Sequence, residues 1–129
     1  MKKLFLVLVA SVFALTACGT VGGAVTNLNV LEFSKKITDK SVVLLDVRTP
    51  GEFASGHIVG AKNIDFYATS FSSEVLKLDK TKTYAVYCHS GNRSGQATAL
   101  MAKDGFKAVF NLDGGIINWQ NAGNPVVTF

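Results

Sequence analysis

Short apolar runs bounded by polar positions recur along the chain. Residues 41–47 form a continuous β-branched and aliphatic run, which is typical of a strand that is covered on both faces. Residues 83–88 and 108–112 have the same character, and residues 61–65 form a shorter run. We therefore predict that these segments are strands of a parallel sheet.

Helix-type patterns separate the apolar runs. Residues 29–32 and 49–52 each place Asn or Thr three positions before Glu, the pattern of a capping box at the start of a helix. The first helix is expected to end near Asp39 and the second at Gly56. Further helical segments are predicted over residues 72–78, 94–103 and 116–121.

Strands and helices alternate throughout, which predicts a single α/β domain over residues 27–129. Its central parallel sheet is expected to hold four or five strands, with right-handed crossovers and helices on both faces. A chain of 129 residues has room for one ordinary domain.

Charge gives little indication of a nucleic-acid partner. The 13 basic residues include Lys2 and Lys3 in the leader, which leaves 11 basic against 9 acidic residues, a net charge of +2. No basic helix face accompanies the adjacent Lys35 and Lys36, so we expect no binding to nucleic acid.

The first residues have the pattern of a secretory signal. Lys2 and Lys3 form a charged start, and residues 4–15 are almost wholly apolar. This run is shorter than the roughly 20 residues that a membrane-spanning helix needs. We predict a signal peptide over residues 1–17.

Residues 15–18, Leu-Thr-Ala-Cys, resemble the lipobox of bacterial lipoproteins. That resemblance implies lipid on Cys18, a membrane anchor and a tether over residues 18–26. Because residue 19 is Gly and not Asp, the resemblance implies that the protein is anchored to the outer membrane and faces the periplasm in a double-membrane bacterium. In a single-membrane bacterium it implies the outer face of the cell. An uncleaved anchor or an ordinary signal peptide is the alternative.

Lipid on Cys18 leaves Cys88 as the only thiol of the mature chain. An unpaired cysteine in an oxidising compartment is a liability, so we expect Cys88 to have a chemical role. It stands between a predicted strand and a predicted helix, where backbone N–H groups and the helix start can stabilise a thiolate.

Cys88-x-x-Gly91-x-Arg93 resembles the active-site loop of single-domain rhodaneses. Residues 46–64 and 112–119 resemble that family's two other signatures, in the same order. The resemblance implies a rhodanese-like fold and a sulfurtransferase that moves a sulfane sulfur from a donor, such as thiosulfate or a persulfide, through a Cys88 persulfide. The acceptor is then a thiol or a cyanide-like thiophile, and no cofactor is needed.

In this scheme Cys88 is the catalytic residue. Arg93 offers a cation to an anionic substrate, although a surface ion pair is the alternative, and His89 either tunes the pocket or is solvated. The predicted substrate-binding residues are His89, Ser90, Gly91, Asn92 and Arg93.

Other polar residues are assigned beside the loop. Asp46 and Arg48 either reach the pocket rim or organise the turn after their strand. His57 is expected to be a structural hydrogen-bonder, and two isolated histidines predict no metal site.

Other functions fit the sequence less well. Phosphatases on comparable loops use Cys-x5-Arg, whereas four residues separate Cys88 from Arg93. A thioredoxin-like role lacks the second cysteine. A rhodanese-like module that binds a partner or carries sulfur without turnover stays open, as does a structural lipoprotein. The oligomeric state and the physiological donor and acceptor are not indicated.

Overall fold

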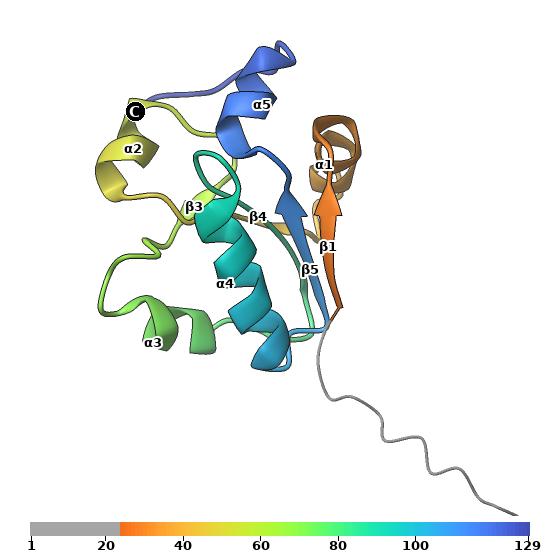
Figure 1. Ribbon diagram of the computed structural model, residues 1–129, viewed down its shortest axis with the longest axis vertical. Helices are drawn as coiled ribbons and strands as arrows, with labels where there is room; N and C mark the ends of the chain where they lie inside the picture. The colour runs from red at the N-terminus through yellow and green to blue at the C-terminus, as the bar shows by residue number, and fades with distance from the viewer. Residues whose placement is uncertain (1–23) are drawn as a thin grey trace, which may run out of the picture.

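A computed structural model describes residues 24–129 of the chain, which form an α/β domain around one sheet (Figure 1). All strand pairs are parallel, and the strand order is β1-β5-β4-β2-β3. The strands are β1 Ala24–Leu28, β2 Val43–Asp46, β3 Lys62–Asn63, β4 Thr83–Tyr87 and β5 Ala108–Leu112. The helices are α1 Val30–Ile37, α2 Pro50–Ser55, α3 Phe71–Leu76, α4 Asn92–Lys103 and α5 Gly115–Asn121.

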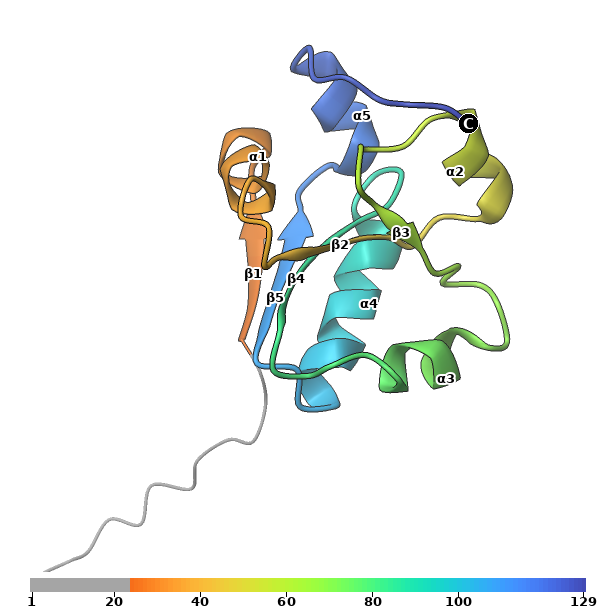
Figure 2. The same cartoon turned by 180° about the vertical axis from the view of Figure 1, so that it is seen from behind.

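Helices cover both faces of the sheet, as the two views show (Figures 1 and 2). α3 and α4 pack on one face, and α1 and α5 pack on the other. Neighbouring strand residues alternate between the two layers: Leu45 and Val86 belong to the α3/α4 cluster, whereas Leu44 and Ala85 belong to the α1/α5 cluster. This double burial explains the continuous apolar runs and confirms the predicted fold.

The two predicted capping boxes are present. The Asn29 side chain accepts from the Glu32 backbone N–H at 2.9 Å, and Glu32 accepts from the Asn29 N–H at 3.1 Å. Thr49 and Glu52 make the equivalent pair at the start of α2. These reciprocal bonds satisfy helix N–H groups that would otherwise lack a partner.

The first strand was not predicted. Residues 24–26 were assigned to a tether, but they belong to β1, which pairs with β5 in the register Ala24 to Ala108 and Leu28 to Leu112. β1 lies at the edge of the sheet, and of its side chains only Leu28 is described as buried. A strand exposed in this way has almost no apolar pattern, so its partner β5 determines its conformation.

Some expectations concern residues that precede the described part. The predicted signal peptide, Cys18 and the rest of the predicted tether lie outside residues 24–129. Within that range, no helix has the length and apolar character needed to cross a membrane.

Candidate active site

Cys88 stands directly after β4, at the carboxyl edge of the parallel sheet, where α/β domains usually bind their ligands. The chain turns at Gly91, the N-cap of α4, which has φ of 101°. The sulfur accepts hydrogen bonds from the Gly91 backbone N–H at 3.1 Å and from the Ser94 hydroxyl at 3.3 Å. Cys88 is only 1% exposed.

The start of α5 orients this loop. The backbone N–H of Ile116 donates to the Cys88 carbonyl at 2.9 Å, and that of Ile117 donates to the His89 carbonyl at 3.2 Å. Because the two polar groups of a peptide point in opposite directions, drawing the His89 carbonyl toward α5 turns the Ser90 N–H toward the sulfur. α5 therefore holds the amides in place without contacting the thiol.

Gly115 allows α5 to come so close. It has φ of 61°, and a β-carbon there would lie 2.5 Å from the His89 carbonyl oxygen and 2.6 Å from that of Cys88. Any other residue would separate α5 from the loop. Gly115 thus supports the site directly.

The surroundings of Cys88 favour the thiolate. Burial alone raises the pKa of the thiol. Four hydrogen-bond donors to the sulfur outweigh this effect of burial: the Ser94 hydroxyl and the amides of Ser94, Gly91 and Ser90. The pKa of Cys88 is therefore lowered from its ordinary value. Near neutral pH, a larger fraction of Cys88 is therefore present as the nucleophilic thiolate than for a free cysteine.

Sequence reasoning used Ser94 only as a helix start. Its side chain is fully buried and supplies the one side-chain donor to the sulfur that we find in the described residues. Side chains in the first turn of a helix are tilted toward its N-terminus. A serine two residues into α4 could therefore have been expected to reach back to the loop.

Arg93 is paired with a residue that the sequence did not assign to the site. Its guanidinium donates to both oxygens of Glu52, each at 2.8 Å, and it also lies over the Tyr67 ring. Hydrogen bonds from Arg93 lower the pKa of Glu52 to about 2, so the carboxylate stays charged. The structure thus places Arg93 in an ion pair with Glu52, the alternative considered from the sequence, and Arg93 also lines a pocket over the loop.

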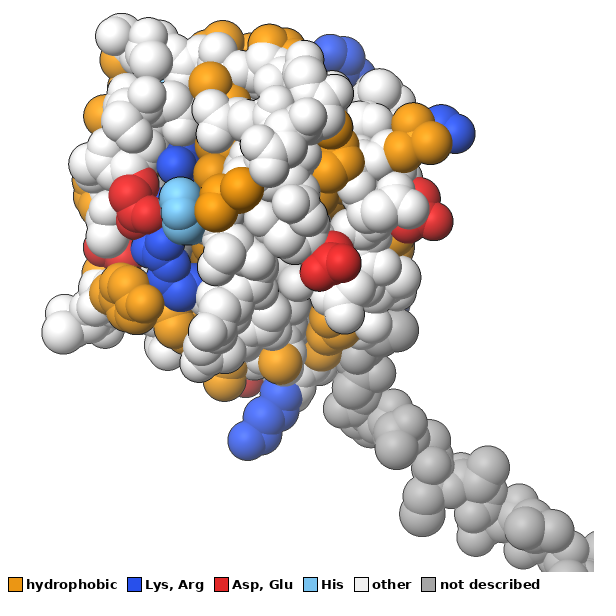
Figure 3. Space-filling view, turned by 45° about the horizontal axis from the view of Figure 1, so that its top comes forward, with side chains coloured by type: hydrophobic (Ala, Val, Ile, Leu, Met, Phe, Trp, Pro, Cys, Tyr) orange, Lys and Arg blue, Asp and Glu red, His pale blue; other side chains and the backbone are white. Residues whose placement is uncertain are grey.

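A pocket of about 430 Å³ opens over the loop. Four of the five predicted substrate-binding residues line it, and the fifth, Gly91, donates to the sulfur. On this face a histidine lies between acidic and basic side chains (Figure 3). The lining residues are Thr49, Glu52, Tyr67, His89, Ser90, Asn92, Arg93 and Gln96.

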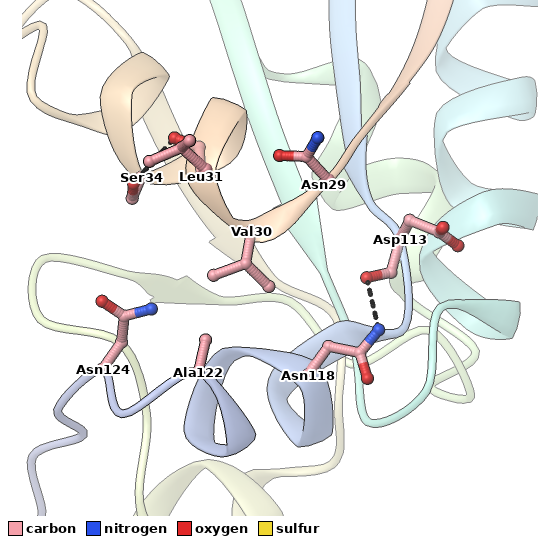
Figure 4. A pocket seen from close by; sticks show the side chains of 8 residues that line it. All are labelled: Asn29, Val30, Leu31, Ser34, Asp113, Asn118, Ala122 and Asn124. Carbon is pink, nitrogen blue, oxygen red and sulfur yellow. Dashed lines mark hydrogen bonds between the residues drawn. The ribbon is translucent and has the colours of Figure 1, made fainter.

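A wider hollow of about 590 Å³ lies between α1 and α5 (Figure 4). Asn29, Asn118 and Asn124 give it an amide-rich wall, but Cys88 and the loop that follows it do not line it. It therefore takes no part in the chemistry of the thiol.

Asp46 and Arg48 do not reach the pocket rim. Arg48 donates to the Asp46 carboxylate at 2.6 Å and to the Gly56 carbonyl at 2.7 Å, and both side chains are buried. The pair fastens the turn after β2 to the end of α2. This geometry fits the turn-organising interpretation, and neither residue is among those that line the pocket over the Cys88 loop.

His57 has the structural role that the sequence predicted. It is 6% exposed, its Nδ1 lies 2.9 Å from the Phe53 carbonyl oxygen, and its ring stacks on Phe53. Within residues 24–129, no cluster of three His, Cys, Asp or Glu side chains is arranged to hold a metal ion.

The chain is similar in sequence to known proteins. Residues 29–122 match the family described as "Rhodanese-like domain". A sulfurtransferase of Allochromatium vinosum is 35% identical over 104 residues, which cover 80% of this chain and 95% of that protein. The thiosulfate sulfurtransferase GlpE of Pseudomonas putida is 36% identical over 90 residues, or 70% of this chain and 77% of its own.

The fold of the chain also matches a solved structure. The rhodanese-related protein of Thermoplasma volcanium superposes with a TM-score of 0.71 at 33% identity, covering 81% of this chain and 99% of its own. The sequence match spans most of the described domain, and it includes the loop that cradles a buried cysteine at the carboxyl edge of the sheet. The chain therefore belongs to the rhodanese-like domain family.

Proposed function

We propose that this protein is a sulfurtransferase that moves a sulfane sulfur from a donor, such as thiosulfate or a persulfide, to a thiophilic acceptor through a persulfide on Cys88. Membership of the family supports a sulfur-transfer role. The observation that carries the proposal is the buried thiol, which accepts from the Gly91 amide and the Ser94 hydroxyl.

The reaction takes place in two displacements. The Cys88 thiolate attacks the outer sulfur of thiosulfate, a new S–S bond forms, and sulfite leaves with the electron pair of the broken bond. A nucleophile such as cyanide or a thiolate then attacks the terminal sulfur, and the Cys88 thiolate is the leaving group. Sulfur atoms and electrons balance without any added oxidant or cofactor.

The loop is suited to the intermediate as well as to the free thiolate. The persulfide extends the charge by one sulfur atom, toward the pocket that His89, Ser90 and Asn92 line. Preorganised N–H donors stabilise charge of this kind because they need no rearrangement during the reaction.

We propose that the Arg93–Glu52 pair favours donors that carry less charge than thiosulfate. Thiosulfate carries two negative charges, and the cation nearest the loop is already balanced by a carboxylate. Glu52 weakens the attraction that Arg93 alone would exert on a dianion. We therefore favour a less highly charged donor, such as a small-molecule or protein persulfide.

We further propose that the domain is anchored to the cell envelope by lipid on Cys18. The support is the sequence alone: two lysines, an apolar run over residues 4–15 and the Leu-Thr-Ala-Cys sequence of residues 15–18. The donor and the acceptor would then be encountered outside the cytoplasm.

The alternative is a rhodanese-like module that accepts sulfur or a partner but does not turn over. Both functions can be tested by mass measurement after incubation with thiosulfate, polysulfide and glutathione persulfide. The proposal predicts a gain of about 32 Da, one sulfur atom, which cyanide removes as thiocyanate. Sulfur uptake without release to any acceptor would favour the module.

Cys88→Ser is the matched variant for this measurement. The serine oxygen cannot form a persulfide, so the mass gain and thiocyanate production should both disappear. Full turnover by Cys88→Ser would remove Cys88 from the mechanism and overturn the proposal.

A further inference from the structure

We infer that the amino edge of the sheet, opposite the active-site loop, docks on an anionic phospholipid bilayer and keeps Cys88 on the side away from it. This interaction surface goes beyond the proposed sulfur transfer, and it rests on the proposed anchor at Cys18. The surface, called the basic edge below, is made of Lys77, Lys80, Lys82, Lys103 and Lys107.

The basic edge lies in the two connections that lead into β4 and β5, together with Lys103 at the end of α4. These connections are in contact, because the backbone N–H of Lys107 donates to the Lys80 carbonyl at 3.2 Å. Lys107 and Lys82 directly precede Ala108 and Thr83, which are paired in the sheet. The five lysines therefore belong to one surface, although they are far apart in the sequence.

These cations are largely free to act on a partner. Lys77, Lys82, Lys103 and Lys107 are exposed, and Lys80 is partly exposed. Within residues 24–129, the only ion pairs are Arg48–Asp46 and Arg93–Glu52. The same two connections contain the acidic residues Asp79 and Asp104, so the basic edge keeps a net positive charge.

The opposite edge of the sheet carries a net negative charge. The loops that follow the carboxyl ends of the strands contain no lysine. Arg48, after β2, and Arg93, at the start of α4, are both paired with carboxylates. Asp65 and Asp113 lie in these loops without an ion pair among the described residues. A net charge of +2 over the mature chain therefore conceals a strong separation of charge between the two edges.

The path of the chain selects a membrane as the partner. The described part begins at Ala24, which pairs with Ala108 and so lies at the basic edge (Figures 1 and 2). Five residues separate Cys18 from Ala24, so even a fully extended chain spans only about 20 Å between the two. A lipid on Cys18 thus brings the basic edge, and not the active-site loop, to the bilayer.

The same geometry sets the orientation of the site. Strand β4 has five residues, so Cys88 lies about 16 Å beyond the basic edge. Lysines within a Debye length of an anionic surface are attracted to it, whereas the acidic side chains of the far edge are repelled. Cys88 then faces the aqueous phase, where it meets soluble donors and acceptors.

The test uses the full, lipid-bearing protein in vesicles of phosphatidylcholine, with or without about one third phosphatidylglycerol. Lysines are acetylated briefly and quantified by mass spectrometry. Acetylation of the basic edge should slow several-fold on the anionic vesicles only, and high salt should restore it. Equal acetylation on both vesicle types would overturn the inference.

A matched pair of charge-reversal variants tests which lysines are responsible. Lys82→Glu/Lys103→Glu/Lys107→Glu changes the basic edge. The control variant makes the same change in net charge at three lysines outside it, the exposed Lys35 and Lys62 and the partly exposed Lys36. Only the first should lose the protection of Lys77 and Lys80 from acetylation on anionic vesicles, because each reversed lysine weakens the attraction of the basic edge to the bilayer by roughly fivefold. Equal losses in the two variants would overturn the assignment to this edge.

Two further measurements separate this inference from the earlier proposals. The mass of the N-terminal peptide reports lipid on Cys18, and persulfide uptake on the same samples reports sulfur transfer. Persulfide uptake can fail while the acetylation pattern still tests docking, whereas absence of lipid on Cys18 would overturn the inference together with the proposed anchor. Protection of the basic edge by an added oligonucleotide, but not by anionic vesicles, would replace the bilayer with nucleic acid and overturn the inference.

Discussion

At the scale of single residues, the reactivity of Cys88 is a balance between burial and donated hydrogen bonds. Burial in the domain opposes ionisation, and the donors from the loop and from Ser94 reverse that effect. The thiol becomes more reactive as the pH rises through its lowered pKa, so activity should persist at a lower pH than for a free cysteine.

Ser94→Ala should shift that pH profile upward. A hydrogen bond to a charged group contributes about 1.5–3 kcal/mol, so losing it should slow alkylation of Cys88 about tenfold at a pH below its pKa. The measurement is the rate of iodoacetamide alkylation against pH. Ser90→Ala is the control, because Ser90 faces the sulfur with its backbone N–H, which alanine keeps. Identical profiles for wild type and Ser94→Ala would contradict the role of the hydroxyl.

Glu52→Gln should improve the use of thiosulfate. Removing the carboxylate charge leaves Arg93 free to attract a dianion, so the KM for thiosulfate should fall several-fold while the KM for a less charged persulfide changes less. Glu32→Gln is the control, since Glu32 occupies the same capping-box position in α1. A KM for thiosulfate that rises in Glu52→Gln would show that the pair itself binds the donor.

At the scale of elements, the backbone of α5, and not its side chains, fixes the conformation of the loop that begins at Cys88. Two N–H groups at the start of α5 fix the carbonyls of Cys88 and His89. The contact requires a residue without a β-carbon at position 115. The catalytic loop is therefore held on one side by α4 and on the other by α5.

Gly115→Ala should impair the site beyond its effect on stability. The added β-carbon would meet the His89 carbonyl, so α5 must move and the amides must turn away from the sulfur. Gly123→Ala is a matched control: it has φ of 83° and the same backbone strain, but its β-carbon would enter open space. Both should unfold at lower temperature, and only Gly115→Ala should lose persulfide formation, by tenfold or more. Equal persulfide yields in the two variants would contradict this role of α5.

The elements that the sequence predicted are those with local signals. Both capping boxes and the doubly buried strands could be predicted because their residues specify them within a few positions. β1 could not, because its exposed side chains take their conformation from β5. Glu52 was recognised as a cap, but its bond to Arg93, 41 positions away, depends on the fold that joins α2 to α4.

At the scale of the whole molecule, the parallel sheet separates the loop that carries the thiol from the lysine-rich connections. Every strand runs in the same direction, so the loops that carry the thiol gather at one edge and the lysine-rich connections at the other. Composition alone suggests a nearly neutral surface, since the charges cancel in the sum. The separation emerges only when the order and direction of the strands are known.

The single tryptophan of the chain can report this orientation. Trp119 is 5% exposed in α5, at the carboxyl edge, so brominated acyl chains in anionic vesicles should leave its fluorescence almost unchanged. Lys82→Trp adds a second indole at the basic edge, and a quenched component should appear. Lys35→Trp, an exposed position outside the basic edge, is the control and should be quenched less. Strong quenching of Trp119 in the wild-type protein would mean that the active-site edge faces the bilayer, the reverse of the orientation inferred from the lysines.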